Sequence, residues 1–352
     1  MTMTQCTPWR MLTYLAAFAG VLLIASLAPA AGVTDRIRTN GGSQAGEITG
    51  MTPLEVSLDK GSTGVDKIPV NQIRNVLFDD EPPELTQARL NVKNGGYTTA
   101  IERLDAIDLS SVERGVIGED VEFYLALCAA KQSLGGKGDV TDAGRKLNEF
   151  VRRHPQNFHY LEAVETMGDL LMASDKYAAA QKQYAELAKA PWPDYKMRAA
   201  VLLGRTLQAQ GKHPEAIEQF DSVLANSDDS NAAREQKLSA TLAKAVSLAE
   251  TEHLDDAVRL IEQMIQDTDP EQKELQARAY NALGECYERA GRSKDALLAF
   301  LHVDVLYSTV PEAHAEALSH LVKLWESVGQ EARAREARQT LNERYGGSRW
   351  AK

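Results

Sequence analysis

Histidines are the first residues to test for chemistry, because they serve most often as general bases and metal ligands. The sequence contains seven of them, and none forms the His-Glu-x-x-His spacing that sets two zinc ligands on one helical face. His314 and His320 are six residues apart, so on one helix they would point to different faces. We therefore expect ordinary helix-surface or turn histidines and no metal site. The seven are His154, His159, His213, His253, His302, His314 and His320.

A glycine-rich stretch with a lysine, Ser133–Gly138, is a second candidate for chemistry. It lacks the Gly-Lys-Ser/Thr ending and the preceding strand of a phosphate-binding loop, so we interpret it as a connection between helices. Pairs of Asp and Glu are abundant, but an acidic chain supplies such pairs by chance. The sequence thus predicts no catalytic residue and no cofactor, and we expect that the protein is not an enzyme.

An alanine recurs along the chain at intervals of 43, 37, 36, 41, 39 and 38 residues. Each of these alanines lies at the start of the second helix of an expected helix pair. Glycine lies twelve residues before this alanine at Gly168, Gly204 and Gly284. Because packed helices approach most closely where Gly or Ala lies at the crossing, we expect Gly284 to be a close-contact position. A period in this range indicates a solenoid. The alanines are Ala100, Ala143, Ala180, Ala216, Ala257, Ala296 and Ala334.

The best-formed repeats resemble the tetratricopeptide repeat family. The sixth carries Tyr280, Leu283, Gly284, Tyr287, Ala296 and Phe300, and the third carries Met167, Gly168, Leu171, Tyr177, Ala180 and Tyr184. The resemblance covers roughly residues 84–345, with spacings longer than the family period of 34. It implies a mainly α fold: a right-handed α-solenoid of about seven such helix pairs over residues 81–352, preceded by a small β segment.

Two cysteines lie in the expected repeats, Cys128 in the second and Cys286 in the sixth. Because the repeats of a solenoid contact only their neighbours, these two cannot form a disulfide. We expect buried, unreactive thiols.

The N-terminal region differs from the rest of the chain. Arg10 is the only charge before Asp35, and an apolar run ends in Ala28-Pro29-Ala30, which predicts a signal peptide over residues 1–30. An uncleaved membrane anchor is the alternative. We expect a polar linker over residues 31–45. Alternating apolar residues then predict four short strands in a β segment, residues 46–80, that resembles a small SH3-like or Sm-like barrel.

Surface residues of the first helices are the remaining site candidates, because in the family these helices line a concave groove. The resemblance implies a basic stripe at Arg198 and Arg205 beside an uncharged stripe at Leu242 and Val246. The alternative is that the two arginines pair within the protein, with Glu165 and Asp169. The candidate peptide-binding residues are Glu165, Asp169, Arg198, Val201, Arg205, Leu242, Val246, Arg278 and Asn281.

The formal net charge of −11 argues against nucleic acid and anionic membranes as partners, because both require clustered Lys and Arg. We expect an exported protein of the periplasm or cell envelope, with no stable membrane insertion after signal cleavage. The resemblance implies a non-catalytic scaffold for proteins or peptides, with an envelope assembly complex as one such partner. The alternative function is binding of glycan or peptidoglycan, for which the supply of aromatic residues is small.

Overall fold

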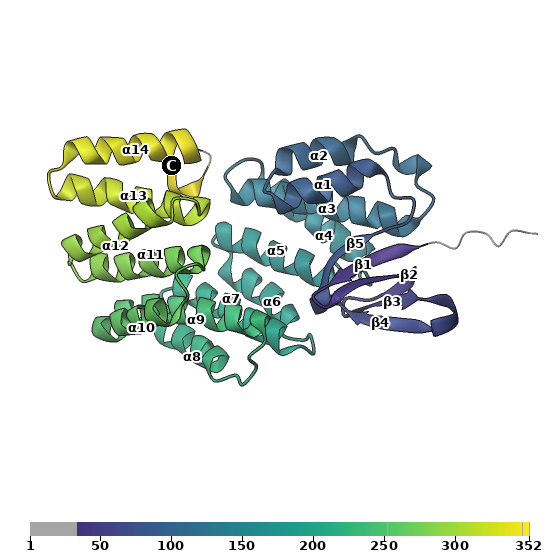
Figure 1. Ribbon diagram of the computed structural model, residues 1–352, viewed down its shortest axis with the longest axis horizontal. Helices are drawn as coiled ribbons and strands as arrows, with labels where there is room; N and C mark the ends of the chain where they lie inside the picture. The colour runs from purple at the N-terminus through teal and green to yellow at the C-terminus, as the bar shows by residue number, and fades with distance from the viewer. Residues whose placement is uncertain (1–33, 252, 347, 352) are drawn as a thin grey trace, which may run out of the picture. The chain divides into compact units, whose positions relative to one another are not determined.

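The computed structural model describes residues 34–251, 253–346 and 348–351 (Figure 1). Within them, a five-stranded antiparallel sheet precedes fourteen α-helices. The predicted mainly α fold with a small β segment before it is confirmed. The expected signal peptide, residues 1–30, and residues 31–33 of the expected linker lie outside the described residues.

The sheet has the strand order β4-β3-β2-β1-β5, and all of its pairs are antiparallel. It begins at residue 35, so the linker expected over residues 31–45 is wrong from there on, and the expected four strands are five. The resemblance to an SH3-like or Sm-like barrel stays a prediction. The strands are β1 (Asp35–Thr39), β2 (Gly42–Met51), β3 (Glu55–Asp59), β4 (Val65–Pro69) and β5 (Ile73–Leu77).

The first strand was missed because its alternation includes a buried charge. Asp35 and Ile37 are fully buried, whereas Arg36 and Arg38 are exposed, as the two faces of a strand require. The Asn40-Gly41 pair forms the two-residue turn to β2, which is a favoured hairpin sequence. The polar composition of β1 therefore led to its prediction as a linker, although the Asn40-Gly41 turn indicates a hairpin at this place.

The sheet shares one apolar core with the first helices. Ile37, Val56 and Phe78 from the β segment belong to the same buried cluster as Leu85 and Val121 from the helices. The buried Asp35 carboxylate accepts hydrogen bonds from the backbone of Ile48 and Asp79 and pairs with Arg114, the residue just before a later helix. The small sheet therefore depends on the helical repeats for part of its core, as its size requires.

The helices follow one another as seven pairs, each packed against the next (Figure 1). Short 3-10 turns lie at Gly61–Thr63, Val70–Gln72, Leu109–Ser111 and Arg349–Ala351. The pairs are α1 (Pro83–Lys93) with α2 (Tyr97–Asp105), α3 (Gly115–Leu134) with α4 (Val140–Arg153), α5 (Tyr160–Ala173) with α6 (Tyr177–Leu187), α7 (Pro193–Ala209) with α8 (His213–Leu224), α9 (Asn231–Glu250) with α10 (Leu254–Asp267), α11 (Lys273–Arg289) with α12 (Ser293–Leu306), and α13 (Pro311–Ser327) with α14 (Glu331–Tyr345).

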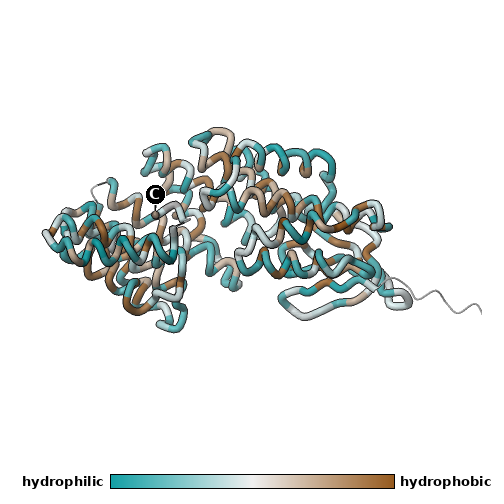
Figure 2. Tube along the Cα trace, turned by 90° about the horizontal axis from the view of Figure 1, so that it is seen from above, coloured by the Kyte–Doolittle hydropathy of each residue, from teal (hydrophilic) through white to brown (hydrophobic). Residues whose placement is uncertain are grey.

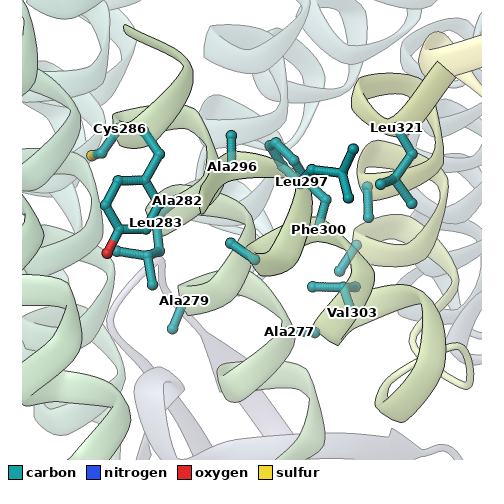
Figure 3. Close-up of a cluster of buried hydrophobic side chains, with 14 of the residues drawn as sticks. Ala277, Ala279, Ala282, Leu283, Cys286, Ala296, Leu297, Phe300, Val303 and Leu321 are labelled. Carbon is teal, nitrogen blue, oxygen red and sulfur yellow. The ribbon is translucent and has the colours of Figure 1, made fainter. Parts of the chain in front are cut away.

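The recurring alanine is the fourth residue of every even-numbered helix, and each is at most 1% exposed. Figure 3 shows Ala296 with Phe300 and Val303 in the cluster of the sixth repeat. Figure 2 shows hydrophobic and hydrophilic residues alternating along most helices, as expected where one side of each helix is buried.

The predicted close contact at Gly284 is confirmed. A Cβ atom on Gly284 would lie 2.6 Å from Cζ of Phe300, which no side chain tolerates without a shift. Gly168 faces Tyr184 and Gly204 faces Phe220 in the same way, each with 2.4 Å to the ring. In these three repeats, the absence of a side chain on the first helix accommodates the aromatic ring of the second.

Candidate binding site

A hollow of about 530 Å³ lies among the odd-numbered helices of the fourth to seventh repeats. We call it the four-helix hollow, because α7, α9, α11 and α13 all contribute to it. Five of the nine predicted site residues line it, namely Arg205, Leu242, Val246, Arg278 and Asn281. The complete lining is Arg205, Gln208, Leu242, Ala243, Val246, Glu274, Arg278, Asn281, Ala282, Glu285, Val310, Glu312, Ala313 and Glu316.

The floor of the hollow on α9 is apolar and rigidly placed. Leu242 is 7% exposed and belongs to a buried core cluster, which explains why this position is uncharged. Gln208 of α7 donates from Nε2 to the Ala243 carbonyl at 2.7 Å and to Ser247 Oγ at 2.9 Å. These two bonds tie α7 to α9, so the floor is formed before any ligand arrives.

Asn281 fixes the opposite side. It is 2% exposed, and its Nδ2 donates to the Ala313 carbonyl at 2.9 Å and to Glu316 Oε2 at 2.8 Å. Its Oδ1 is buried and accepts no hydrogen bond from the described part of the protein. Asn281 therefore joins α11 to α13 and holds the Glu316 carboxylate in place, which makes it a positioning residue.

Arg278, three residues before Asn281 on α11, also lines the hollow and is half-buried. Within the described residues its guanidinium has neither a hydrogen bond nor an ion pair, whereas Arg205, Glu285, Glu312 and Glu316 each have partners in the protein. Its N–H groups are therefore available to an acceptor from a ligand.

The other four predicted residues lie outside the hollow. Arg198 pairs with Glu165, with Nη2 at 2.6 Å and Nε at 2.9 Å from Oε1, so local pairing is confirmed for this arginine. Asp169 accepts a hydrogen bond from the Tyr184 hydroxyl at 2.9 Å. Val201 is 2% exposed and packs within the core of the fourth repeat.

Burial also changes the acidity of this pair. Removal of Glu165 from water raises its pKa to about 7, although the neighbouring Arg198 acts to lower it. The Glu165 side chain is 13% exposed, whereas that of Arg198 is 46% exposed. The loss of water around the Glu165 carboxylate therefore raises its pKa by more than the charge of Arg198 lowers it.

The sequence analysis missed a buried ionic cluster between the sheet and the helices. Arg89 of α1 pairs with Asp120 of α3 at 2.6 Å and with Glu81 at 2.7 Å. His159 contributes its Nε2, 2.9 Å from Asp120, and its ring stacks on Phe123 at 3.8 Å between centroids. These residues lie 31 and 39 positions apart, so no local pattern could have indicated them.

The cluster holds its charges in place. Burial acts to raise the pKa of Asp120, but Arg89 and His159 outweigh it and lower that pKa. Burial acts to lower the pKa of His159, but Asp120 and Glu162 outweigh it and raise that pKa. The expectation of surface or turn histidines is therefore wrong for His159, and for His314, which is 1% exposed and bonded to Asp304 and Tyr345.

Other candidates of the sequence analysis have structural explanations. Asp139, the N-cap of α4, accepts hydrogen bonds from Thr141 and Asp142 and so occupies the helix end that follows the glycine-rich loop. Cys128 and Cys286 are buried and unpaired, as predicted. Among the described residues, no group of three or more His, Cys, Asp or Glu is arranged to hold a metal ion.

Seven helix pairs packed in sequence order define a helical-repeat solenoid. The tetratricopeptide repeat profile matches residues 166–231 and 242–308, so these two segments are similar to tetratricopeptide repeats. These segments span most of the third to sixth repeats, from which α7, α9 and α11 of the four-helix hollow come.

Solved structures support the same fold. The chain is similar to a tetratricopeptide repeat protein from Parabacteroides merdae ATCC 43184, with 17% identity, a TM-score of 0.51, and coverage of 74% of this chain and 92% of that one. It is also similar to the apo form of the quorum sensor NprR from B. thuringiensis, with 13% identity, a TM-score of 0.53, and coverage of 74% of each chain. No curated protein sequence matches the chain. In the part of the chain that the structure describes, none of the helices has both the length and the apolar character needed to cross a membrane.

Proposed function

We propose that this protein is a non-catalytic scaffold of the cell envelope that binds a peptide, or an extended segment of a partner protein, in the four-helix hollow. Tetratricopeptide repeats support a role in protein interaction. The observation that carries the choice of site is Arg278, a half-buried residue of the lining that has no acceptor among the described residues.

Several features of the hollow favour a peptide as the ligand. Its apolar floor at Leu242 and Val246 can cover an aliphatic side chain, and Arg278 can donate to a carboxylate or to backbone carbonyls with its planar set of N–H groups. The hydrogen bonds of Gln208 and Asn281 fix the surrounding helices, so little ordering is required on binding. Binding would thus occur on a largely preformed surface.

The test of the site uses photo-crosslinking in intact cells. Benzoylphenylalanine in place of Val246, in the hollow, should cross-link to a partner segment that mass spectrometry can sequence. The matched control places it at Val328, which is 41% exposed and outside the lining. Arg278→Ala should reduce the cross-linked yield about tenfold or more, since truncating a buried hot-spot arginine costs about 2 kcal/mol or more.

Arg198→Ala is the control for Arg278→Ala. It removes the same side chain from a position outside the hollow and should leave the yield unchanged. Equal cross-linking at positions 246 and 328, or a yield unaffected by Arg278→Ala in a folded protein, would place the binding surface elsewhere.

The envelope location rests on Arg10, the apolar run after it and Ala28-Pro29-Ala30. Mass spectrometry of the protein from its native cells should find a mature N-terminus at Ala31. A full-length species that remains with the membrane fraction would favour the anchor instead.

A glycan ligand has less support. Sugar sites commonly stack the ring on an aromatic side chain, and the described lining of the hollow contains none. Trp192 packs against the core shared by the sheet and first helices, and Trp325 lies under Arg333. Binding to purified peptidoglycan without any protein cross-link would favour a glycan over a peptide as the ligand.

A further inference from the structure

Helix α12 carries a row of exposed apolar side chains. Leu298 is 62% exposed, Val305 is 70% exposed and Leu306 is 55% exposed. The half-buried Leu301 lies between them on the same side of the helix, and we call these four residues the α12 stripe. Among the described residues, no other helix exposes more than one large apolar side chain. Single exposed apolar residues are common, whereas a row of them on one helix indicates an interaction surface.

The other repeats show that the fold does not require apolar residues at these positions. Leu298, Leu301 and Val305 are the second, fifth and ninth residues after the packing alanine Ala296. In the repeats before and after, the same three positions are polar or charged. They are Arg259, Glu262 and Gln266 in α10, and Glu336, Gln339 and Glu343 in α14. The α12 stripe is therefore a departure from the repeat pattern that the packing within the chain does not explain.

The spacing of the stripe fits a second helix. Lys294, Leu298, Leu301 and Val305 follow one another at intervals of four, three and four residues. Apolar residues at these alternating intervals form the seam between the helices of a coiled coil, and a valine in the place of Val305 with a leucine in the place of Leu301 favours two helices. At about 1.5 Å per residue, the seam from Lys294 to Val305 is about 17 Å long. The side chain of Lys294 can extend past its end into water.

The charges of the neighbouring repeats indicate how two copies would meet. Figure 1 shows α12 between α10 and α14. Three Asp, one Glu and one Arg give α10 a net charge of −3, whereas four Arg and three Glu give α14 a net charge of +1. An antiparallel pair of α12 helices would place α10 opposite α10 of the second copy, and a parallel pair places α10 opposite α14. Arg338 of α14 also pairs with Glu326 of α13, so the advantage of the parallel pair is mainly the repulsion that it avoids.

We propose that the α12 stripe is a dimer interface, occupied by the α12 helix of a second copy of this chain, with the two helices parallel. In such a two-fold pair Leu298 packs against Leu298 of the second copy, and Val305 against Val305, as a self-complementary surface requires. The inference goes beyond the proposed function, since no residue of α12 lines the four-helix hollow. A dimer would present two hollows, so a partner with two matching segments would bind it more tightly than it binds one copy.

The test measures the oligomeric state of the protein isolated from its native cells, by sedimentation equilibrium from about 1 to 300 µM. A seam of one helix per copy is smaller than the roughly 1,200 Å² of a standard interface, so the dissociation constant should be about 1–100 µM. Leu298→Glu should raise this constant at least about tenfold, because each copy then adds a carboxylate to the seam.

Leu90→Glu is the matched control for Leu298→Glu. It makes the same change at a leucine of α1 that is 51% exposed, and it should leave the dissociation constant unchanged. Because both positions are exposed and leucine and glutamate have similar helix propensities, both variants should keep the helicity of the wild-type protein, measured by circular dichroism.

Cysteine cross-linking tests the direction of the two helices. Leu298→Cys and Val305→Cys should each form a disulfide between copies under mild oxidation, because in a parallel pair each residue meets its own counterpart. The wild-type protein is the control, and its Cys128 and Cys286 are buried. An antiparallel pair would instead join the two variants to each other when they are mixed, and this result would contradict the proposal.

Other results would overturn the second copy itself as the occupant. A protein that stays monomeric up to about 300 µM, or a dimer whose dissociation constant Leu298→Glu does not change, would do so. Benzoylphenylalanine in place of Val305 should cross-link in cells to give a product of twice the mass of the chain. A cross-link to a different protein, or to residues 1–30 of the same chain, would identify another occupant. The cross-linking at position 246 tests the hollow separately, so either proposal can fail without the other.

Discussion

Gly284→Ala tests the packing that defines each repeat. The added Cβ would lie 2.6, 2.7 and 2.8 Å from three ring atoms of Phe300. Favourable carbon contacts lie at about 3.5–4.0 Å, so the overlap is roughly 0.7–0.9 Å with each atom. Phe300 is fully buried and cannot turn its ring into water. Overpacking of this kind costs about 1–3 kcal/mol, and the better helix propensity of alanine returns about 1 kcal/mol. The net expectation is a destabilisation of about 0–2 kcal/mol.

Gly144→Ala is the matched control, because Gly144 also lies inside a helix, α4, but its Cβ would meet no atom within 4 Å. That change should stabilise the protein by up to about 1 kcal/mol. The two variants should therefore differ by about 1–3 kcal/mol in the free energy of unfolding, measured by urea titration with circular dichroism. Hydrogen exchange should locate the loss in α11 and α12.

The reasoning has a second check in the partner ring. Phe300→Leu removes the atoms that the new Cβ would meet, so Gly284→Ala should cost less in that background, with a coupling energy of about 1 kcal/mol or more. If Gly284→Ala stabilises the protein as much as Gly144→Ala does, or costs the same with and without Phe300, the ring contact does not set the helix spacing.

Three further outcomes are expected. Folding raises the pKa of Glu165 from 4.5 to about 7, so the folded protein binds this proton more tightly than the unfolded chain does. The stability that this proton contributes is complete below pH 4.5 and is lost as the pH rises through 7. Glu165→Gln should remove this part of the pH dependence of urea unfolding. Asp120→Asn leaves Arg89 and His159 without their shared carboxylate and should cost about 3–5 kcal/mol, whereas Asp142→Asn at an exposed ion pair should leave the free energy of unfolding almost unchanged in the same titration. Burial raises the pKa of both Cys128 and Cys286 to about 12, so iodoacetamide at neutral pH should modify them in urea but not in the native protein, as read by mass spectrometry; rapid native labelling of either would contradict the packing of its repeat.

The repeats were predictable because their signal is local. A small residue is required at the fourth position of each even-numbered helix, and a ring four residues later requires glycine on the first helix where the two approach. Sequence spacing alone therefore located every helix pair. β1 escaped notice because Asp35 is a charged residue at an inward position, and the arginine that compensates it, Arg114, lies 79 residues away.

The candidate site was only partly predictable, because its charges depend on neighbours from other repeats. Arg198 and Arg205 lie seven residues apart on α7 and have equal standing in the sequence. Arg198 forms an ion pair with Glu165 of the preceding repeat, whereas Arg205 lines the hollow formed with the following repeats. Which of the two arginines faces the hollow is decided by packing between repeats, and no spacing within one helix contains that information.

Helix α11 shows how the fold separates stability from binding. Gly284 faces Phe300 of its own repeat, and Arg278, six residues earlier, faces the hollow. The first position tolerates almost no change, because a fully buried ring lies against it. The second makes no hydrogen bond or ion pair within the described residues, so the folded state loses little if it changes. Repeats can therefore keep their small and aromatic packing residues while the surface of the odd-numbered helices varies. In this chain, that surface carries Arg278, whose N–H groups can donate to an acceptor that a ligand supplies.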